Sequence, residues 1–221
     1  MELIGTVAFA SSGAMIAIEK KMDIFGVNVL GATTAVGGGI MRDIILGLTP
    51  PGAFSHPVYV LVAALTSTIL FVIAYAKPTA FESRVKTDYY DKLMFWCDTA
   101  GLGIFTVVGI QAAVRAVGGE NVFFFVFIGT LTGVGGGVLR DIMAGETPYI
   151  LVKHIYACAA IAGGIVCVVG RTAFGEAYGT ILGLAATVLL RFFGSSFQVE
   201  SDACIIRFFI SENSRMIRKL Q

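Results

Sequence analysis

Charged residues are scarce in this chain of 221 residues, since Asp, Glu, Lys and Arg together make up only 14% of it. Soluble domains carry about 25% charged residues, whereas 56% of this sequence is hydrophobic and its mean hydropathy is +0.82. The composition excludes a soluble globular protein and predicts an integral membrane protein. The net charge of +1 gives no indication of a nucleic-acid partner.

Side chains for metal binding or catalysis are also few. The chain has two histidines and four cysteines, and the cysteines show neither a CxxC motif nor another metal-ligand spacing. No pair of nucleophile and base and no phosphate-binding loop stands out. We therefore expect no enzyme activity, no metal and no cofactor, and we expect lipid to be bound at the surface.

Seven hydrophobic runs approach the roughly 20 residues that a helix needs to cross a bilayer. They are residues 3–18, 27–46, 58–76, 93–114, 122–144, 150–170 and 173–190. No basic segment precedes the first run, so we expect it to remain as a span and not to be removed as a signal peptide. The predicted fold class is an all-α integral membrane protein with seven transmembrane helices.

One segment of 21 residues occurs twice, as VGGGIMRDIILGLTPPGAFSH at 36–56 and as VGGGVLRDIMAGETPYILVKH at 134–154. Each residue of the second copy lies 98 positions after its counterpart, and eleven of the 21 positions are identical. A duplication of this kind fixes the architecture before any residue is given a role. Because each repeat holds three spans, the second repeat enters the membrane the other way up, which predicts two inverted repeats followed by a seventh helix.

The membrane domain is predicted to cover residues 1–193. It comprises repeat one at 1–78, a linker at 79–92, repeat two at 93–171 and the seventh helix at 173–191, and residues 194–221 form a cytoplasmic or interfacial tail. Twelve Lys and Arg residues, Arg191 among them, are expected in loops on one side, against Arg115 and Arg171 on the side of the N-terminus. The positive-inside rule then places the N-terminus outside and the C-terminus in the cytoplasm.

Both copies contain three consecutive glycines, which are Gly37, Gly38 and Gly39 in the second span and Gly135, Gly136 and Gly137 in the fifth. Each glycine weakens a helix by roughly 1 kcal/mol relative to alanine. Close packing of helices is one explanation, and a kink or break that frees backbone groups beside a water-filled path is the other. Because the triplet recurs at matching positions, we favour the break and predict kinked second and fifth helices. Hydroxyl side chains in the spans are candidates to line the path; they belong to Ser11, Ser12, Thr33, Thr34, Thr130 and Thr132.

Ionisable residues inside the spans form the second candidate set, and they are Arg42, Asp43, Arg140, Asp141 and Asp98. A charge near the bilayer centre costs roughly 2.5–3.5 kcal/mol on insertion scales, so such residues usually face the interior of the bundle. Adjacent helical residues point about 100° apart, so we expect Arg42 to pair with Asp141, and Arg140 with Asp43, across the repeats. This network either locks the repeats together or lines and gates a path. If Gly13 corresponds to Gly101, the counterpart of Asp98 in the first span is Ala10.

With two GGGxxRD segments on the second and fifth spans, and the run DTAGLGIFTVVGIQAA in the fourth, the sequence resembles the bacterial branch of the trimeric intracellular cation channel family. Members of that branch also carry the UPF0126 and glycine transporter labels, and the resemblance covers about residues 3–191. It implies a homotrimer in a bacterial inner membrane, with one pore per protomer lined by the kinked second and fifth helices. It also implies passage of monovalent cations, chiefly potassium with some sodium.

Two functions fit these residues. In a cation channel, carbonyls freed at the glycines replace part of the hydration shell, and Asp43, Asp98 and Asp141 favour cations. The channel requires that Arg42 and Arg140 be neutralised or act as a gate. In a secondary transporter of a small zwitterion such as glycine, the arginine and aspartate beside a broken helix hold the carboxylate and the ammonium. We predict the channel over the transporter.

Overall fold

The computed structural model describes residues 1–76, 88–152 and 155–194. Most of the predicted linker, His154 and residues 195–221 of the predicted tail lie outside this range. The long helices are α1 (Glu2–Glu19), α2 (Ile24–Ile45), α4 (Val58–Ala76), α6 (Asp88–Val117), α7 (Val122–Met143), α9 (Ile155–Phe174) and a seventh helix at Glu176–Gly194. All seven are long and apolar enough to cross a membrane. The prediction of an all-α integral membrane protein with seven transmembrane helices is confirmed.

Helices α2 and α7 begin and end in the same way. The side chains of Asp23 and Asn121 cap their first turns by accepting hydrogen bonds from the amides of Gly26 (2.7 Å) and Phe124 (3.0 Å). Each helix is followed by a glycine with positive φ, Gly47 at +70° and Gly145 at +71°. The turns then lead into two short helices, α3 (Gly52–Ser55) and α8 (Tyr149–Val152).

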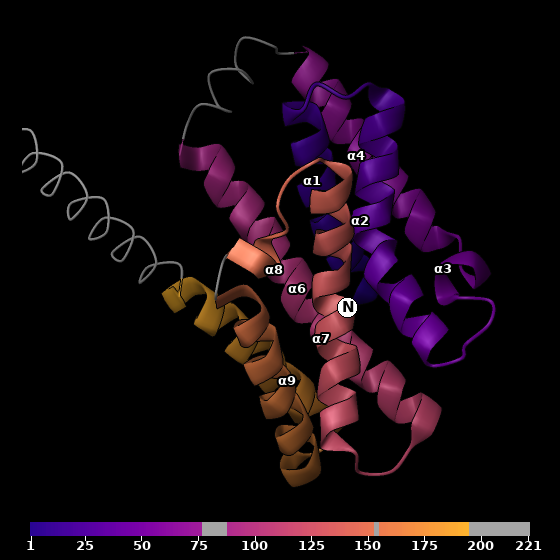
Figure 1. Ribbon diagram of the computed structural model, residues 1–221, viewed down its shortest axis with the longest axis vertical. Helices are drawn as coiled ribbons and strands as arrows, with labels where there is room; N and C mark the ends of the chain where they lie inside the picture. The colour runs from indigo at the N-terminus through magenta and orange to yellow at the C-terminus, as the bar shows by residue number, and fades with distance from the viewer. Residues whose placement is uncertain (77–87, 153–154, 195–221) are drawn as a thin grey trace, which may run out of the picture.

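The helices form two groups of three that meet at α2 and α7 (Figure 1). Helices α1, α2 and α4 pack together, as do α6, α7 and α9, and α1 also packs along α6. We call the end of the bundle where α1 begins and α2 finishes the N-terminal face, and the end where α1 and α7 finish the opposite face. Large apolar side chains such as Leu65 (63% exposed) and Val169 (55% exposed) point outward, as lipid contact requires.

The glycine triplets lie inside uninterrupted α-helices, because α2 and α7 keep their helical hydrogen-bonding pattern through both. The prediction of a break that frees carbonyls and amides is therefore wrong. A bend of the helix axis without a break stays a prediction.

Close packing explains the glycines instead. A Cβ on Gly38 would lie 2.1 Å from the carbonyl oxygen of Thr132, and a Cβ on Gly136 would lie 2.2 Å from that of Thr34. Only residues without a side chain let two backbones approach so closely.

The contacts at this crossing are reciprocal. Gly38 and Thr34 of α2 stand 98 positions before Gly136 and Thr132 of α7, and each glycine meets the carbonyl of the other helix's threonine. The neighbouring glycines behave alike, since Gly37 faces Leu139 and Gly135 faces Met41, again a pair 98 positions apart. A pseudo-two-fold axis through the crossing accounts for these contacts, and they support the predicted inverted repeats.

Candidate functional site

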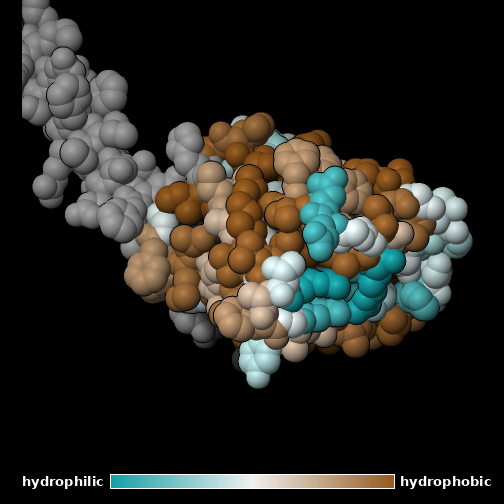
Figure 2. All heavy atoms as spheres, turned by 90° about the horizontal axis from the view of Figure 1, so that it is seen from below, coloured by the Kyte–Doolittle hydropathy of each residue, from teal (hydrophilic) through white to brown (hydrophobic). Residues whose placement is uncertain are grey.

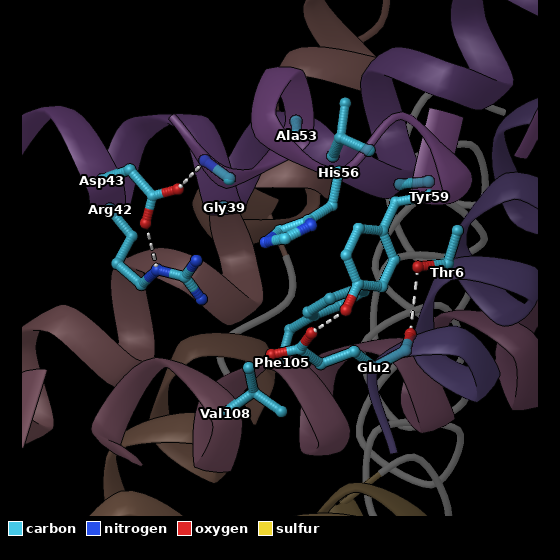
Figure 3. A pocket seen from close by; sticks show the side chains of 13 residues that line it. Glu2, Thr6, Gly39, Arg42, Asp43, Ala53, His56, Tyr59, Phe105 and Val108 are labelled. Atoms are coloured by element: carbon cyan, nitrogen blue, oxygen red, sulfur yellow. Dashed lines mark hydrogen bonds and ion pairs between the residues drawn. The ribbon is translucent and has the colours of Figure 1, made fainter. Parts of the chain in front are cut away.

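A cavity of about 300 Å³ lies between α1, α2, α4 and α6 at the N-terminal face. Its polar lining residues are Glu2, Thr6, Arg42, Asp43, His56 and Tyr59, and in Figure 3 the imidazole of His56 points into the space between Arg42 and Tyr59. Figure 2 views the molecule from the end where α2 finishes and α7 begins, and hydrophilic residues gather there in one area of a mostly hydrophobic surface.

The arginine and aspartate of the first repeat pair with each other. Arg42 donates from Nε to Oδ1 of Asp43 at 2.8 Å, and Oδ2 of Asp43 accepts from the amide of Gly52 at 2.7 Å. The Arg42 side chain is long enough to reach the carboxylate of the next residue, and the Gly52 amide holds that carboxylate in place. On the other side of the cavity, the Tyr59 hydroxyl donates to Oε2 of Glu2 (Figure 3).

Matching residues form a second cluster toward the opposite face. Arg140 donates from Nε to Oδ1 of Asp141 at 2.9 Å, and Oδ2 of Asp141 accepts from the amide of Tyr149 at 2.9 Å. The predicted pairs across the repeats are therefore wrong, because the inverted arrangement carries the two Arg-Asp dipeptides toward opposite faces beyond the glycine crossing. Each aspartate instead ties its neighbouring arginine to the turn that follows its helix.

This second cluster is sealed. Arg140 donates from Nη1 to Oδ1 of Asp98 at 2.7 Å and also to the hydroxyl of Ser12. The Tyr156 hydroxyl donates to the same carboxylate oxygen at 3.4 Å. The side chains of Arg140 and Asp98 are 0% and 1% exposed, whereas Arg42 in the first cluster is 15% exposed.

The seventh helix completes the sealed cluster with Arg191. Its Nη1 lies 2.7 Å from Oδ2 of Asp98, and its guanidinium lies over the rings of Tyr156 (4.3 Å) and Phe95 (5.1 Å). Arg191 is 5% exposed, so its expected place among the loop charges was wrong. Two arginines and the two aspartates Asp98 and Asp141 balance each other in charge, as buried ions require.

Most residues of one cluster have a counterpart in the other. Gly13 packs on the hydroxyl of Thr34, and Gly109 packs on that of Thr132, so α1 matches α6 with an offset of 96 positions. The predicted match of Gly13 with Gly101 was wrong for this reason. The counterpart of Asp98 is therefore Glu2 and not Ala10.

Two phenylalanines separate the clusters. The rings of Phe9 and Phe105 stack with centroids 5.2 Å apart and planes inclined by 25°. Phe105 lines the cavity, while Phe9 is 1% exposed and fits against Gly101 and Gly136, which have no side chains to displace it. Phe9 and Phe105 also stand 96 positions apart, so this stack is a second contact on the pseudo-two-fold axis.

One face of α1 contributes residues to the cavity, the aromatic stack and the sealed cluster. Glu2, Thr6, Phe9 and Ser12 are spaced by four, three and three residues, which places them along one side of a helix. From the N-terminal face inward, this side presents a carboxylate and a hydroxyl at the cavity, then the aromatic stack, then the hydroxyl that binds Arg140.

The predicted threonines lie away from the cavity lining. Thr34 and Thr132 are buried, and their hydroxyls donate within their own helices to the carbonyls of Leu30 and Ile128, both at 2.6 Å. Thr130 lines a groove of apolar side chains on α7 and α9, and Thr33 is partly buried one turn before Gly37. Their role as pore hydroxyls stays a prediction.

The predicted glycines divide into two kinds. Gly37, Gly38, Gly135 and Gly136 lie at the helix crossing. Gly39 lines the cavity, and Gly137 lies beneath the sealed cluster, where an added Cβ would be 2.8 Å from the Tyr156 hydroxyl.

Several site residues were not predicted from the sequence, namely Glu2, Phe9, Tyr59, Phe105, Tyr156 and Arg191. The spacing of Glu2, Phe9 and Ser12 along one helix face was the available signal. The two tyrosines each follow a repeated histidine, but they are 97 positions apart and so fall out of register with the offset of 98.

Fold and site together define an integral membrane protein with an open cavity of mixed charge on one side and a buried ion cluster, built from matching residues, on the other. The family model described as Glycine transporter matches residues 1–75 and 95–172. The chain belongs to this family of UPF0126 membrane proteins, the bacterial branch of the trimeric intracellular cation channels.

Among its relatives, the UPF0126 inner membrane protein YadS of Escherichia coli is 36% identical over 193 residues, which are 86% of this chain and 88% of YadS. A UPF0126 membrane protein of Deinococcus radiodurans is 39% identical over 165 residues, which are 74% of this chain and 71% of that protein. These relatives are membrane proteins, and this chain is a multi-pass membrane protein of the same kind.

Solved structures of cation channels have the same fold. The TRIC trimeric intracellular cation channel orthologue from Rhodobacter sphaeroides is 33% identical and superimposes with a TM-score of 0.78, covering 89% of this chain and 96% of the channel. A structure that addresses conductance through TRIC cation channels is 35% identical with a TM-score of 0.75, covering 89% and 92%. The structural neighbours therefore support a cation channel.

Proposed function

We propose that this protein is a potassium-permeable channel and that each protomer of a homotrimer contains its own path. The path follows the inner face of α1 from the cavity at the N-terminal face to the sealed cluster near the opposite face. From Glu2 to Ser12 it covers ten residues, or about 15 Å of helix. The observation that carries the proposal is the sequence of cavity, aromatic stack and ion cluster along this one face.

Charge at the cavity favours cations. Its lining includes two carboxylates, those of Glu2 and Asp43, and one arginine, Arg42. Arg42 is bound to Asp43, so the charge of Glu2 is left without a cationic partner among the lining side chains. A concave surface with net negative charge raises the local concentration of cations.

Two barriers close the path in the described conformation. The stack of Phe9 and Phe105 forms an apolar layer, and constrictions of this kind block ions by excluding water. Beyond it, Arg140 is hydrogen-bonded to Asp98 and Ser12 and so takes up their polar groups. Conduction requires the two rings to part and Arg140 to release Asp98, whose carboxylate then faces the permeant ion.

The helix crossing takes a different role from the one that the sequence led us to expect. Because α2 and α7 remain continuous at their glycines, carbonyls freed at the triplets are not the ligands of the ion. The crossing instead serves as a close-packed pivot between the repeats, with the two clusters on its two sides.

A transporter of a small zwitterion is the second candidate. The family description Glycine transporter favours it, and so does a cavity of about 300 Å³ that offers Arg42 and Glu2 to opposite charges. Potassium-loaded liposomes distinguish the two functions. The channel predicts potassium efflux that rises linearly with the gradient and no saturable uptake of glycine, and saturable glycine uptake without potassium efflux would overturn it.

Assembly and orientation are part of the same proposal. Resemblance to the family supports three copies, and the Lys and Arg distribution, now eleven against two without the buried Arg191, supports an external N-terminus in a bacterial inner membrane. We expect native mass measurement in detergent to give three chains of 23.4 kDa, whereas a stable monomer would contradict the trimer.

A further inference from the structure

The two clusters contain equivalent residues, yet one is open and the other is sealed. Each has a carboxylate on its first helix, an Arg-Asp dipeptide tied to the following turn, and a tyrosine that donates to the carboxylate. The pseudo-two-fold axis by itself gives no reason for one to close. The cause must lie in residues that the repeat does not duplicate.

Three such residues touch the sealed cluster. Ser12 accepts a hydrogen bond from Arg140, but its counterpart 96 positions later is Val108, which has no acceptor for Arg42. The ring of Tyr149 lies 5.4 Å from the Arg140 guanidinium, and its counterpart 98 positions earlier is Pro51. The third is Arg191, which belongs to the seventh helix and has no counterpart in either repeat. Of the three, only Arg191 brings a charge.

Arg191 is held from several sides. Its guanidinium pairs with Asp98 and lies over the rings of Tyr156 and Phe95. The next residue, Phe192, stacks on Trp96 of α6 with centroids 5.9 Å apart. These contacts fasten the last turn of the seventh helix to α6 and α9 around Asp98.

We propose that Arg191 is the latch of the closed channel and that the seventh helix thereby selects which of the two equivalent clusters is shut. Arg191 is a positioning residue in this role, because it covers Oδ2 of Asp98 while Arg140 covers Oδ1. With both oxygens engaged, the carboxylate has none left for a cation, and Arg140 stays in the path. When Arg191 withdraws with the end of the seventh helix, Asp98 can turn toward the path and Arg140 loses its fixed partner.

This inference rests on the proposed channel, and single-channel recording of Arg191→Gln tests it. Removing the latch charge shifts the balance toward the open state, and couplings of this kind typically change an equilibrium by roughly 5- to 150-fold. We expect the ratio of open to closed time to rise on the order of tenfold with an unchanged unitary current. Arg191→Lys keeps the charge and is expected to return the ratio most of the way to the wild-type value.

Arg115→Gln is the matched control. Arg115 pairs with Glu176 at 3.3 Å and so also links α6 to the seventh helix, but at the N-terminal face, where Arg115 is 72% exposed. Its substitution is expected to leave the open probability unchanged. If Arg115→Gln raises it as much as Arg191→Gln does, general loosening of the helix explains the effect and the latch is wrong.

The double variant Asp98→Asn/Arg191→Gln removes one buried charge of each sign and guards against misfolding of the single variant. We expect it to stay more open than the wild type. An open probability at the wild-type level in both Arg191→Gln and the double variant would overturn the latch. Potassium currents from the wild type would still support the proposed channel in that case. Absence of currents from the wild type would overturn both.

Discussion

Substitution of Gly38 by alanine tests the close packing of α2 on α7. The added Cβ would lie 2.1 Å from the carbonyl oxygen of Thr132, about 1.3 Å short of the 3.4 Å at which ordinary contact begins. That oxygen belongs to backbone and cannot turn aside, so the helices must separate. Overpacking of this kind costs typically 1–3 kcal/mol, and the gain in helix propensity of up to about 1 kcal/mol offsets only part of it.

We therefore expect Gly38→Ala to lose roughly 2 kcal/mol of stability. A chain of this length shifts its Tm by roughly 2–4 °C per kcal/mol, so the apparent Tm in detergent should fall by about 4–8 °C. Gly136→Ala should behave alike, because its Cβ would lie 2.2 Å from the carbonyl oxygen of Thr34. The double variant should lose less than the sum, since one separation of the helices relieves both contacts.

Gly39→Ala supplies the control within the same triplet. The nearest atom to its added Cβ is Nη2 of Arg42 at 3.9 Å, which is ordinary contact. We expect its Tm to equal or exceed that of the wild type because alanine favours the helix. If Gly38→Ala melts at or above the temperature of Gly39→Ala, the glycines are not there for packing and a hinge in the helices becomes the better explanation.

The remaining predictions concern the path. Phe9→Ala removes half of the aromatic barrier, so we expect currents that fail to close fully, at a cost of about 3–5 kcal/mol for the emptied core position; closures as complete as those of the wild type would count against the barrier. Glu2→Gln should lower the unitary potassium current at low salt and have little effect at high salt, where the field is screened; an equal loss at both salts would point to a structural role. In a double-mutant cycle on Tm, Arg140 and Asp141 should couple by more than about 1 kcal/mol while Arg42 and Asp141 should be additive; the reverse would restore the pairing across the repeats.

Much of the fold was predictable because the lengths of the hydrophobic runs decide how many helices span the membrane. Seven runs near 20 residues gave the seven spans, and the repeated segment at 36–56 and 134–154 gave matching turns after α2 and α7. Among the charges inside the bundle, the locations of the two Arg-Asp dipeptides and of Asp98 were predictable, since buried ions in lipid must face protein, whereas Arg191 was wrongly expected in a loop.

The geometry at the glycines was not predictable from the pattern. A triplet in a membrane helix is compatible with close packing and with a break, and both place small residues at matching positions. Only the distance from Gly38 to the Thr132 carbonyl decides for packing. The same limit applies to Arg42 and Asp43, because the backbone directions of neighbours exclude a pair only for short side chains, and arginine is long.

The partners of Asp98 could not be predicted from the sequence for another reason. They are Arg140 of α7, Tyr156 of α9 and Arg191 of the seventh helix. Contacts among residues so far apart in sequence depend on how the helices cross, and one sequence gives no measure of that. Even the match of Asp98 with Glu2 needed the structure, because α1 and α6 follow a different offset from α2 and α7.

The reversal potential of the purified protein in a planar bilayer tests the proposed function most directly. With a tenfold gradient of potassium chloride, a channel that passes cations along the Glu2 cavity and past Asp98 should show unitary currents that reverse close to the potassium potential, roughly 59 mV from zero at 25 °C. Currents that reverse near zero or toward the chloride potential would contradict cation selection by this site, and a membrane without unitary currents would contradict the channel itself.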